Sequence, residues 1–148
     1  MTDVKTIDRA ALAAELDRII ASLDARIEGS YVFTTHAPIP DDVQVFASVR
    51  EQEAVTSVIP VAEAERLGLP IEPSYTRISI GAKTSLDTVG ITAMVAQTLA
   101  SREIPCNVIA GFWHDHLFVP ENQAGEAQAL LNALSEQARG WSKLPKSD

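Results

Sequence analysis

The clearest fold signal lies in residues 75–119, which read YTRISIGAKTSLDTVGITAMVAQTLASREIPCNVIAGFWHDHLFV. Residues 75–80 are rich in β-branched and aromatic residues and stand between turn-forming segments, which predicts a strand. After the turn, apolar residues recur at helical spacing from Leu86 onward, which predicts a helix. Two further apolar runs, 106–113 and 116–119, predict a pair of strands joined by a short turn.

The order of these elements constrains the topology of the sheet. A strand–helix–strand unit crosses over in the right-handed sense and makes a parallel pair, to which the hairpin adds an antiparallel strand. A last helix follows Pro120, because apolar residues return at helical spacing between Ala127 and Ala138. We predict an α+β fold, a mixed antiparallel sheet with helices packed on it, of the ferredoxin-like kind.

The first half of the chain is less regular. Asp8 can cap a helix whose apolar stripe continues to Ile27, and Gly29 then ends it. The other elements predicted there are strands at 30–36, 43–50 and 54–59, a short helix over 60–67 and a proline-rich linker over 69–74. The predicted limits are 1–28 for the N-terminal helix, 29–74 for the first half, 75–140 for the second half and 141–148 for the tail.

Composition and charge exclude several classes of function. The formal net charge of −8 argues against nucleic acid and anionic membranes as partners, because both require clustered Lys and Arg. No apolar stretch approaches the ~20 residues of a membrane span, and acidic residues throughout positions 1–25 are unlike a signal peptide. Cys106 is the single cysteine and lies in an apolar run, which predicts a buried, inert thiol. We therefore expect a cytoplasmic protein.

Three stretches of the second half resemble a known family. Residues 83–93 (KTSLDTVGITA) and 104–108 (IPCNV) resemble the first strand–helix–strand unit of an ACT domain. Residues 110–120 (AGFWHDHLFVP) are similar to a bacterial ACT subgroup with two ACT-like halves in one short chain, which in turn resembles the ACT repeats of aspartate kinases and of a eukaryotic arginine sensor. The resemblance covers residues 30–138 and implies two βαββαβ halves, a homodimer, and an amino acid bound where two units meet.

The resemblance also implies a position for the amino-acid site, between the turn at residues 83–90 and a facing strand end near Asp115. Independently of the family, a helix N-terminus offers unpaired N–H groups that suit a carboxylate, and Asp115 can receive the ammonium group. The predicted ligand-binding residues are Thr84, Ser85, Asp87, Thr88, Val89, Gly90, Ile109, Gly111 and Asp115. The same residue types also fit a structural role, in which Ser85 caps the helix, Asp87 complements its dipole and Gly90 packs on the sheet.

No catalytic motif or cofactor site stands out in the sequence. It contains no nucleophile elbow and no phosphate-binding glycine loop, so we predict a non-enzymatic protein without a cofactor. His114 and His116 can share one face of a strand, but only His36 and a carboxylate remain to complete a metal site, so we predict none. The leading hypothesis is an amino-acid sensor. The alternatives are a ligand-free pairing module, with Phe112 or Trp113 filling the pocket, and an enzyme.

Overall fold

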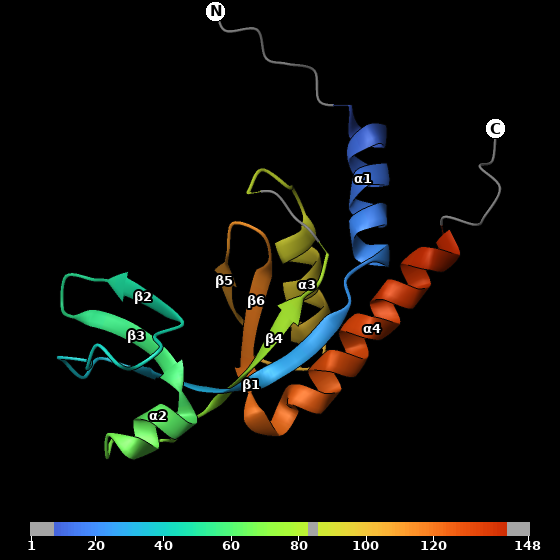
Figure 1. Ribbon diagram of the computed structural model, residues 1–148. Helices are drawn as coiled ribbons and strands as arrows, with labels where there is room; N and C mark the ends of the chain where they lie inside the picture. Colours follow the sequence, from blue (N-terminus) through green and yellow to red (C-terminus); the bar gives the residue numbers. More distant parts are fainter. Residues whose placement is uncertain (1–7, 83–85, 142–148) are drawn as a thin grey trace, which may run out of the picture.

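A six-stranded sheet runs through the computed structural model, which describes residues 8–82 and 86–141. The strand order is β2-β3-β1-β4-β6-β5, and each neighbouring pair is antiparallel (Figure 1). The strands are β1 (Ala25–Thr34), β2 (Ala47–Arg50), β3 (Val55–Pro60), β4 (Tyr75–Ile80), β5 (Asn107–Ala110) and β6 (Asp115–Pro120). The predicted α+β class, with helices packed on an antiparallel sheet, is confirmed.

Four α-helices and one short 3-10 helix accompany the sheet in the described part of the chain. They are α1 (Arg9–Ala21), α2 (Val61–Arg66), α3 (Ile91–Ala100), η1 (Glu121–Gln123) and α4 (Ala124–Trp141). Figure 1 shows α1, α3 and α4 beside the second half of the sheet and α2 beside the first half. Within residues 8–82 and 86–141, none of these helices has the length and apolar character needed to cross a membrane.

The strand order reveals two units that share their central strands. In each unit a first strand leads to a hairpin and then to a helix: β1 to β2, β3 and α2, and β4 to β5, β6 and α4. β4 is also the fourth strand of the first unit, and β1 occupies the equivalent place in the second unit. The predicted parallel relation within the strand–helix–strand unit is present, since β4 and β5 both run antiparallel to β6, but β6 lies between them.

The two hairpins correspond position by position. Val58 of β3 pairs with Ala47 of β2, and the residues sixty positions later, Phe118 and Asn107, pair in the same way. The inner strand of each hairpin ends in a proline that begins the next helix. The halves differ in what precedes the hairpin, because the second half has α3 where the first half has an irregular segment over residues 35–46. We call this segment the replacement loop.

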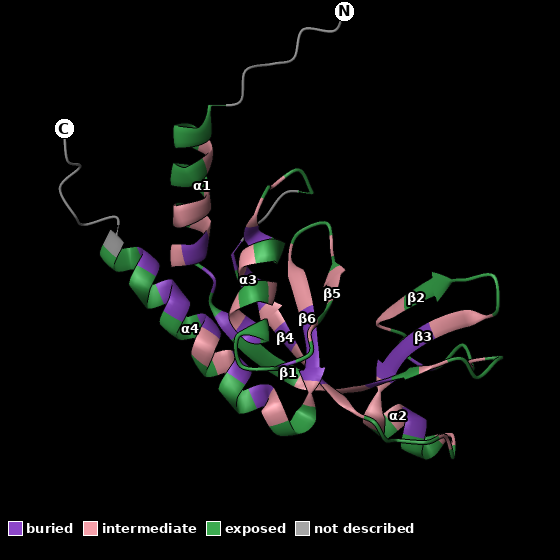
Figure 2. Ribbon diagram, turned by 180° about the vertical axis from the view of Figure 1, so that it is seen from behind, coloured by how far each residue is buried: buried purple, intermediate pink, exposed green. Residues whose placement is uncertain are grey.

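The main core lies between the second half of the sheet and three helices. On β4, the buried residues Thr76, Ile78 and Ile80 alternate with half-buried ones, so one face of the strand packs against the helices. Figure 2 shows the buried stripes of α3 and α4 turned toward the sheet. The buried helical residues of this core are Ile20, Ile91, Val95, Leu99, Ala124, Ala127, Leu131, Leu134 and Ala138. A smaller core under α2 consists of Val32, Val43, Ile59 and Ala64.

The first predicted helix is longer than the observed one. α1 ends at Ala21, whereas the prediction extended it to Ile27. Asp24 takes a left-handed conformation, with φ of +46°, and β1 begins directly after it at Ala25. Gly29 therefore does not end a helix but lies inside β1, where the pairing with β4 shifts its register.

The extents of two predicted strands also need correction. The strand predicted over residues 43–50 begins only at Ala47, because residues 43–46 belong to the replacement loop. The strand predicted over residues 106–113 is limited to β5, which ends at Ala110. By contrast, the strand predicted over residues 75–80 coincides with β4 and is confirmed.

Candidate ligand sites

The predicted amino-acid site centres on the start of α3. The helix begins at Ile91, later than the predicted start at Leu86, so Asp87 does not lie in its first turn as expected. Gly90 is the N-cap residue in a left-handed conformation, with φ of +97°, and offers the first N–H groups no side-chain acceptor. A Cβ at Gly90 would lie 3.2 Å from Leu16 Cδ2, so this glycine packs on α1 and not on the sheet.

The loop that leads into α3 contains most of the other predicted residues. Asp87 and Val89 are exposed there, Val89 to 60%, and Thr88 is half-buried. Thr84 and Ser85 lie outside the described residues. The loop therefore presents an acidic and an apolar side chain to solvent next to the uncapped helix start.

Asp115 is the predicted residue of β6 that lies beside the start of α3. Together with Ile91 and Thr92 it lines an apolar gap of about 10 Å³, which is too small for an amino acid. Asp115 shares the helix-covered face of the strand with Leu117, because alternate strand residues point to the same side. The helix start and the carboxylate are thus adjacent, with the space between them filled by apolar side chains.

The remaining predicted residues lie near the start of α3 but do not line the gap beside Asp115. Ile109 is paired with His116 and faces the opposite side of the sheet. Gly111 lies in the β5–β6 turn, where its N–H donates to the carbonyl oxygen of His114 at 2.8 Å. A Cβ at Gly111 would lie 2.8 Å from that oxygen, so the turn itself requires a glycine here.

The opposite face of the sheet, which we call the open face, carries a cluster of aromatic rings. Phe46 precedes β2, yet its ring centroid lies 5.0 Å from that of His116 and 5.5 Å from that of Phe118 on β6. Neighbouring strands lie about 4.8 Å apart, so β2 and β6 would be separated by roughly 19 Å in a flat sheet. The sheet is therefore curled, which brings the first half onto the second. The cluster also contains Tyr31, Phe33 and Tyr75.

Arg77 of β4 lies inside this cluster. Its guanidinium carbon is 4.6 Å from the ring centroid of Phe46 and 5.3 Å from that of Tyr31, within cation–π range. Its Nη1 lies 3.3 Å from Nδ1 of His116, while its Nε is buried without a hydrogen-bond partner. The salt bridges among the described residues do not include Arg77. The enclosed Nε cannot be reached from solvent, so an acceptor from another molecule would meet the side of the guanidinium that lines the adjoining cavity.

A cavity of about 320 Å³ opens beside Arg77 on the open face. His114 and His116 both line it, so alternate residues share one side as the sequence suggested. Burial lowers the pKa of His116, and the neighbouring Arg77 and His114 lower that pKa further, which favours the neutral imidazole. Among residues 8–82 and 86–141, no three His, Cys, Asp or Glu side chains are arranged to hold a metal ion.

The far wall of this open-face cavity is acidic. Glu28 of β1 lines it and accepts a hydrogen bond from the Ser79 hydroxyl at 2.6 Å. Asp24 also lines it, but its carboxylate is paired with Arg26 at 2.5 Å, which raises the pKa of that guanidinium. Arg26 lines the cavity as well, so the lining holds two cations and two carboxylates, of which Arg26 and Asp24 pair with each other.

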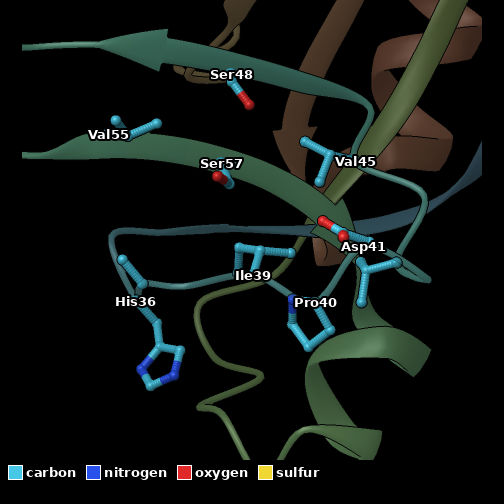
Figure 3. A pocket seen from close by; sticks show the side chains of 10 residues that line it. His36, Ile39, Pro40, Asp41, Val45, Ser48, Val55 and Ser57 are labelled. Atoms are coloured by element: carbon cyan, nitrogen blue, oxygen red, sulfur yellow. The ribbon is translucent and has the colours of Figure 1, made fainter.

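A second cavity, of about 380 Å³, lies in the first half between the replacement loop and the β2–β3 hairpin (Figure 3). The strands contribute Ser48, Val55 and Ser57, and the loop contributes Asp41 among other residues. Figure 3 shows the ring of His36 directed away from the two strands. Two hydroxyl groups, one carboxylate and the imidazole of His36 lie among apolar side chains in this lining, and no hydrogen bond within the described part of the chain joins them into a site of particular chemistry.

Arg77 was not among the predicted site residues, although the sequence carried one signal for it. It is a charged residue in the middle of an otherwise uncharged strand, flanked by Thr76 and Ile78. Strand alternation places Arg77 on the face opposite the core. Its contact with Phe46 depends on the curl of the sheet, which local sequence patterns do not report.

Comparisons with known proteins agree with this architecture. One model of the ACT domain matches residues 13–75 and a second matches residues 71–133. A Vibrio cholerae protein of unknown function, described as a possible transport protein, is 32% identical with a TM-score of 0.70, over 81% of this chain and 95% of that chain. A protein from Agrobacterium tumefaciens is 21% identical with a TM-score of 0.57, over 75% of this chain and 87% of that chain.

A further solved structure shares the fold. The regulatory subunit of aspartate kinase from Thermus thermophilus, in its ligand-free form, is 11% identical with a TM-score of 0.53, over 76% of this chain and 97% of that chain. No curated protein matches the sequence. The fold and the matches define a tandem of two regulatory-type units in one chain. The chain belongs to the ACT domain family, so the predicted resemblance and the two ACT-like halves are confirmed.

Proposed function

We propose that this protein is a non-catalytic sensor that binds a free amino acid at the start of α3. ACT domains are typically ligand-binding regulatory modules, which favours binding over catalysis. The observation that carries the proposal is the uncapped helix start at Gly90, with Asp115 beside Ile91 and Thr92. The carboxylate of the ligand would accept hydrogen bonds from the first N–H groups of the helix, and the ammonium group of the same ligand would meet Asp115.

We also infer that two copies pair to complete this site. The gap beside Asp115 holds only about 10 Å³, so a ligand must lie outside it, at a surface that a second copy can cover. The adjoining loop and hairpin lie together, with His114 Nδ1 3.4 Å from the carbonyl oxygen of Ala82. They expose four large apolar side chains, Leu86, Val89, Phe112 and Trp113, which pairing would bury.

The organisation of the chain and its location complete the proposal. Within the homodimer, residues 29–74 and 75–140 would act as the first and second units, with residues 1–28 as an N-terminal segment and 141–148 as a tail. A sensor of free amino acids would act in the cytoplasm, without nucleic acid or membrane as a partner, as the net charge of −8 favours. The proposed binding of an amino acid requires no cofactor.

One observation favours an alternative, a pairing module without a ligand. Phe112 and Trp113 are 70% and 64% exposed, with ring centroids 5.0 Å apart. Neither ring fills the gap beside Asp115, so both are free to contact another copy. Pairing through these rings alone would need no amino acid.

The test is a thermal-shift screen of the protein against the twenty amino acids. A ligand at about 100 times its dissociation constant adds about 2.7 kcal/mol, which raises the melting temperature by several degrees for a chain of this length. The Asp115→Asn variant should lose that shift, whereas Asp41→Asn, which removes a carboxylate from the replacement loop, should keep it. Sedimentation should show a dimer whose pairing strengthens with the amino acid.

Two outcomes would contradict the proposal. If no amino acid shifts the melting temperature while the protein still sediments as a dimer, the ligand-free pairing module is the better description. If an amino acid shifts wild type and Asp115→Asn equally, the ligand does not bind at the start of α3. Asp115 is preferred over Gly90 for this test, because a side chain at Gly90 would strain the backbone and press on Leu16.

A further inference from the structure

The guanidinium of Arg77 is fixed in place but not neutralised. The rings of Phe46 and Tyr31 lie 4.6 and 5.3 Å from its central carbon, which limits its movement. Its hydrogen-bond partner among the described residues is the imidazole of His116, and its Nε–H remains unbonded. An arginine presents a fork of donors that matches a carboxylate, and this guanidinium lines the open-face cavity without a salt bridge among the described residues, so its cavity-facing side offers a place for an anionic group.

The charges around the open-face cavity leave one cation and one carboxylate unmatched. Asp24 and Arg26 pair with each other at 2.5 Å and so offset their charges. Glu28 accepts one hydrogen bond, from Ser79 at 2.6 Å, and a carboxylate can accept several more. Arg77 and Glu28 line the same cavity without forming a salt bridge within the described residues, so each can meet an opposite charge on a ligand.

This arrangement selects against two simple classes of ligand. A dianion such as phosphate would meet Arg77 but would be repelled by Glu28, whose charge no described salt bridge offsets. A divalent cation would be repelled by Arg77, and no three candidate metal ligands gather among the described residues. The cavity of about 320 Å³ is at the small end of the roughly 300–1,000 Å³ range of ligand pockets, which suits a small metabolite.

We propose that the open face holds a second ligand site, in which Arg77 binds the carboxylate and Glu28 the ammonium group of a small zwitterion. The ligand class is an amino acid or a similar amino-carboxylate. Tyr31 and Phe46 hold the guanidinium in position, and Ser79 orients Glu28. The site lies across the sheet from the start of α3, and it stands or fails independently of the function proposed above.

An NMR titration of the full chain with glycine tests this site. Glycine carries both charges, whereas acetate and methylammonium each carry one of them. Glycine should shift the backbone amide signals of Arg77, Ser79 and His116 at millimolar concentrations, and each half-ligand should bind at least about tenfold more weakly, since one charged hydrogen bond is worth ~1.5–3 kcal/mol. Signals of Ile91 and Thr92 report separately on the start of α3.

Two variants identify the contacts. Arg77→Met keeps an apolar stem between the rings and should abolish the glycine shifts on the open face. Glu28→Gln changes an exposed side chain, so the fold should persist, and it should weaken glycine binding about tenfold or more without weakening acetate binding, because it removes a charge that repels anions. Glu53→Gln makes the same substitution in the β2–β3 turn, far from the cavity, and should bind glycine like wild type.

The proposal is overturned by any of three results. Glycine could fail to shift the open-face signals, acetate could bind as tightly as glycine, or Glu28→Gln could bind glycine as wild type does. Asp115→Asn separates this proposal from the sensor function, because it should remove shifts at Ile91 and Thr92 without changing those at Arg77. Loss of both sets of shifts in Arg77→Met, with an unchanged fold, would also contradict two independent sites.

Discussion

The two halves of this chain cover equivalent residues of their hairpins in different ways, with the helix α3 in the second half and the irregular replacement loop in the first half. In the second half, α3 covers Val108, Asp115 and Leu117, and the gap left beneath it is about 10 Å³. The equivalent residues of the first half, sixty positions earlier, are covered by the replacement loop, which leaves a cavity of about 380 Å³. The strand pairing is the same in both halves.

The comparison shows which part of the unit the fold can lose. The first half keeps its sheet without the first helix because β1 and β4 belong to both units, and the larger core under α1, α3 and α4 stabilises them. Among the described residues, the first half therefore has no counterpart of the α3 start; its own helix, α2, begins after β3, just as α4 follows β6 in the second half. The ligand site proposed at the start of α3 thus has no counterpart in the first half as the structure describes it.

The largest expected difference between the halves is in the cost of removing a buried side chain. Leu99→Ala, in α3, should lower the free energy of unfolding by about 2–5 kcal/mol, because Leu99 is fully buried in the main core. Val43→Ala, in the replacement loop, should cost about 1.5 kcal/mol, since it removes two carbons from a smaller core. Urea denaturation with a common slope measures both values.

The control for this experiment makes the same substitution where nothing packs. Leu86 is 68% exposed, so Leu86→Ala should change the free energy of unfolding by less than about 0.5 kcal/mol. Equal costs for Leu99→Ala and Val43→Ala would mean that the replacement loop packs as tightly as the helix, so that the two halves would not differ in packing.

A smaller expected difference between the halves lies in how the free energy of unfolding depends on pH. Burial, Arg77 and His114 lower the pKa of His116, while Asp115 and Glu28 act in the opposite direction with less effect. The unfolded chain therefore binds a proton at His116 more readily than the folded one, so stability should decrease as pH falls below about 6.5, the ordinary histidine value. Above that pH the contribution is fully present.

The His116→Gln variant measures this contribution. Its free energy of unfolding should fall less steeply than that of wild type between about pH 7.5 and pH 5.5, because one titrating group is absent. The equivalent position in the first half is Thr56, which does not titrate, and a Thr56→Ser control should follow the wild-type slope. Equal slopes for wild type and His116→Gln would show that the His116 pKa is the same in the folded and unfolded states.

The smallest expected effect comes from making the first half resemble the second at one position. Ser48 lines the first-half cavity, and the equivalent residue of the second half is Val108. Ser48→Val should raise the free energy of unfolding by at most about 0.5 kcal/mol, because a β-branched residue suits an exposed strand position. A loss of more than about 1 kcal/mol in a denaturation curve would indicate that the hydroxyl has a structural role of its own.

Local sequence signals predicted some single elements well and the N-terminal boundary poorly. Residues 75–80 and the short helix before Gly68 were correctly placed, because alternation and a left-handed glycine act locally. The stripe that continues to Ile27 fits a helix and a strand equally well. It was Asp24, and not a glycine, that adopted the left-handed conformation before β1, whereas the sequence favoured Gly29 because glycine is the commonest residue at positive φ.

The candidate sites depended more on long-range structure. The adjacency of Asp115 and the start of α3 follows from the order of elements and was predictable, but the true helix start at Ile91 was not. The open-face site was missed because Arg77 meets Phe46 only after the sheet curls. Curling depends on the summed twist of six strands and on aromatic contacts between the halves, which no short stretch of sequence encodes.

The most direct test of a ligand site confined to the second half is hydrogen exchange with and without the amino acid selected by the thermal-shift screen. Binding at the start of α3 should slow exchange in residues 86–95 and leave the replacement loop unchanged, because that loop, which is described in full, contains no helix start equivalent to that of α3. Slower exchange in residues 35–46, with no change in residues 86–95, would place the ligand in the first half and contradict the proposal.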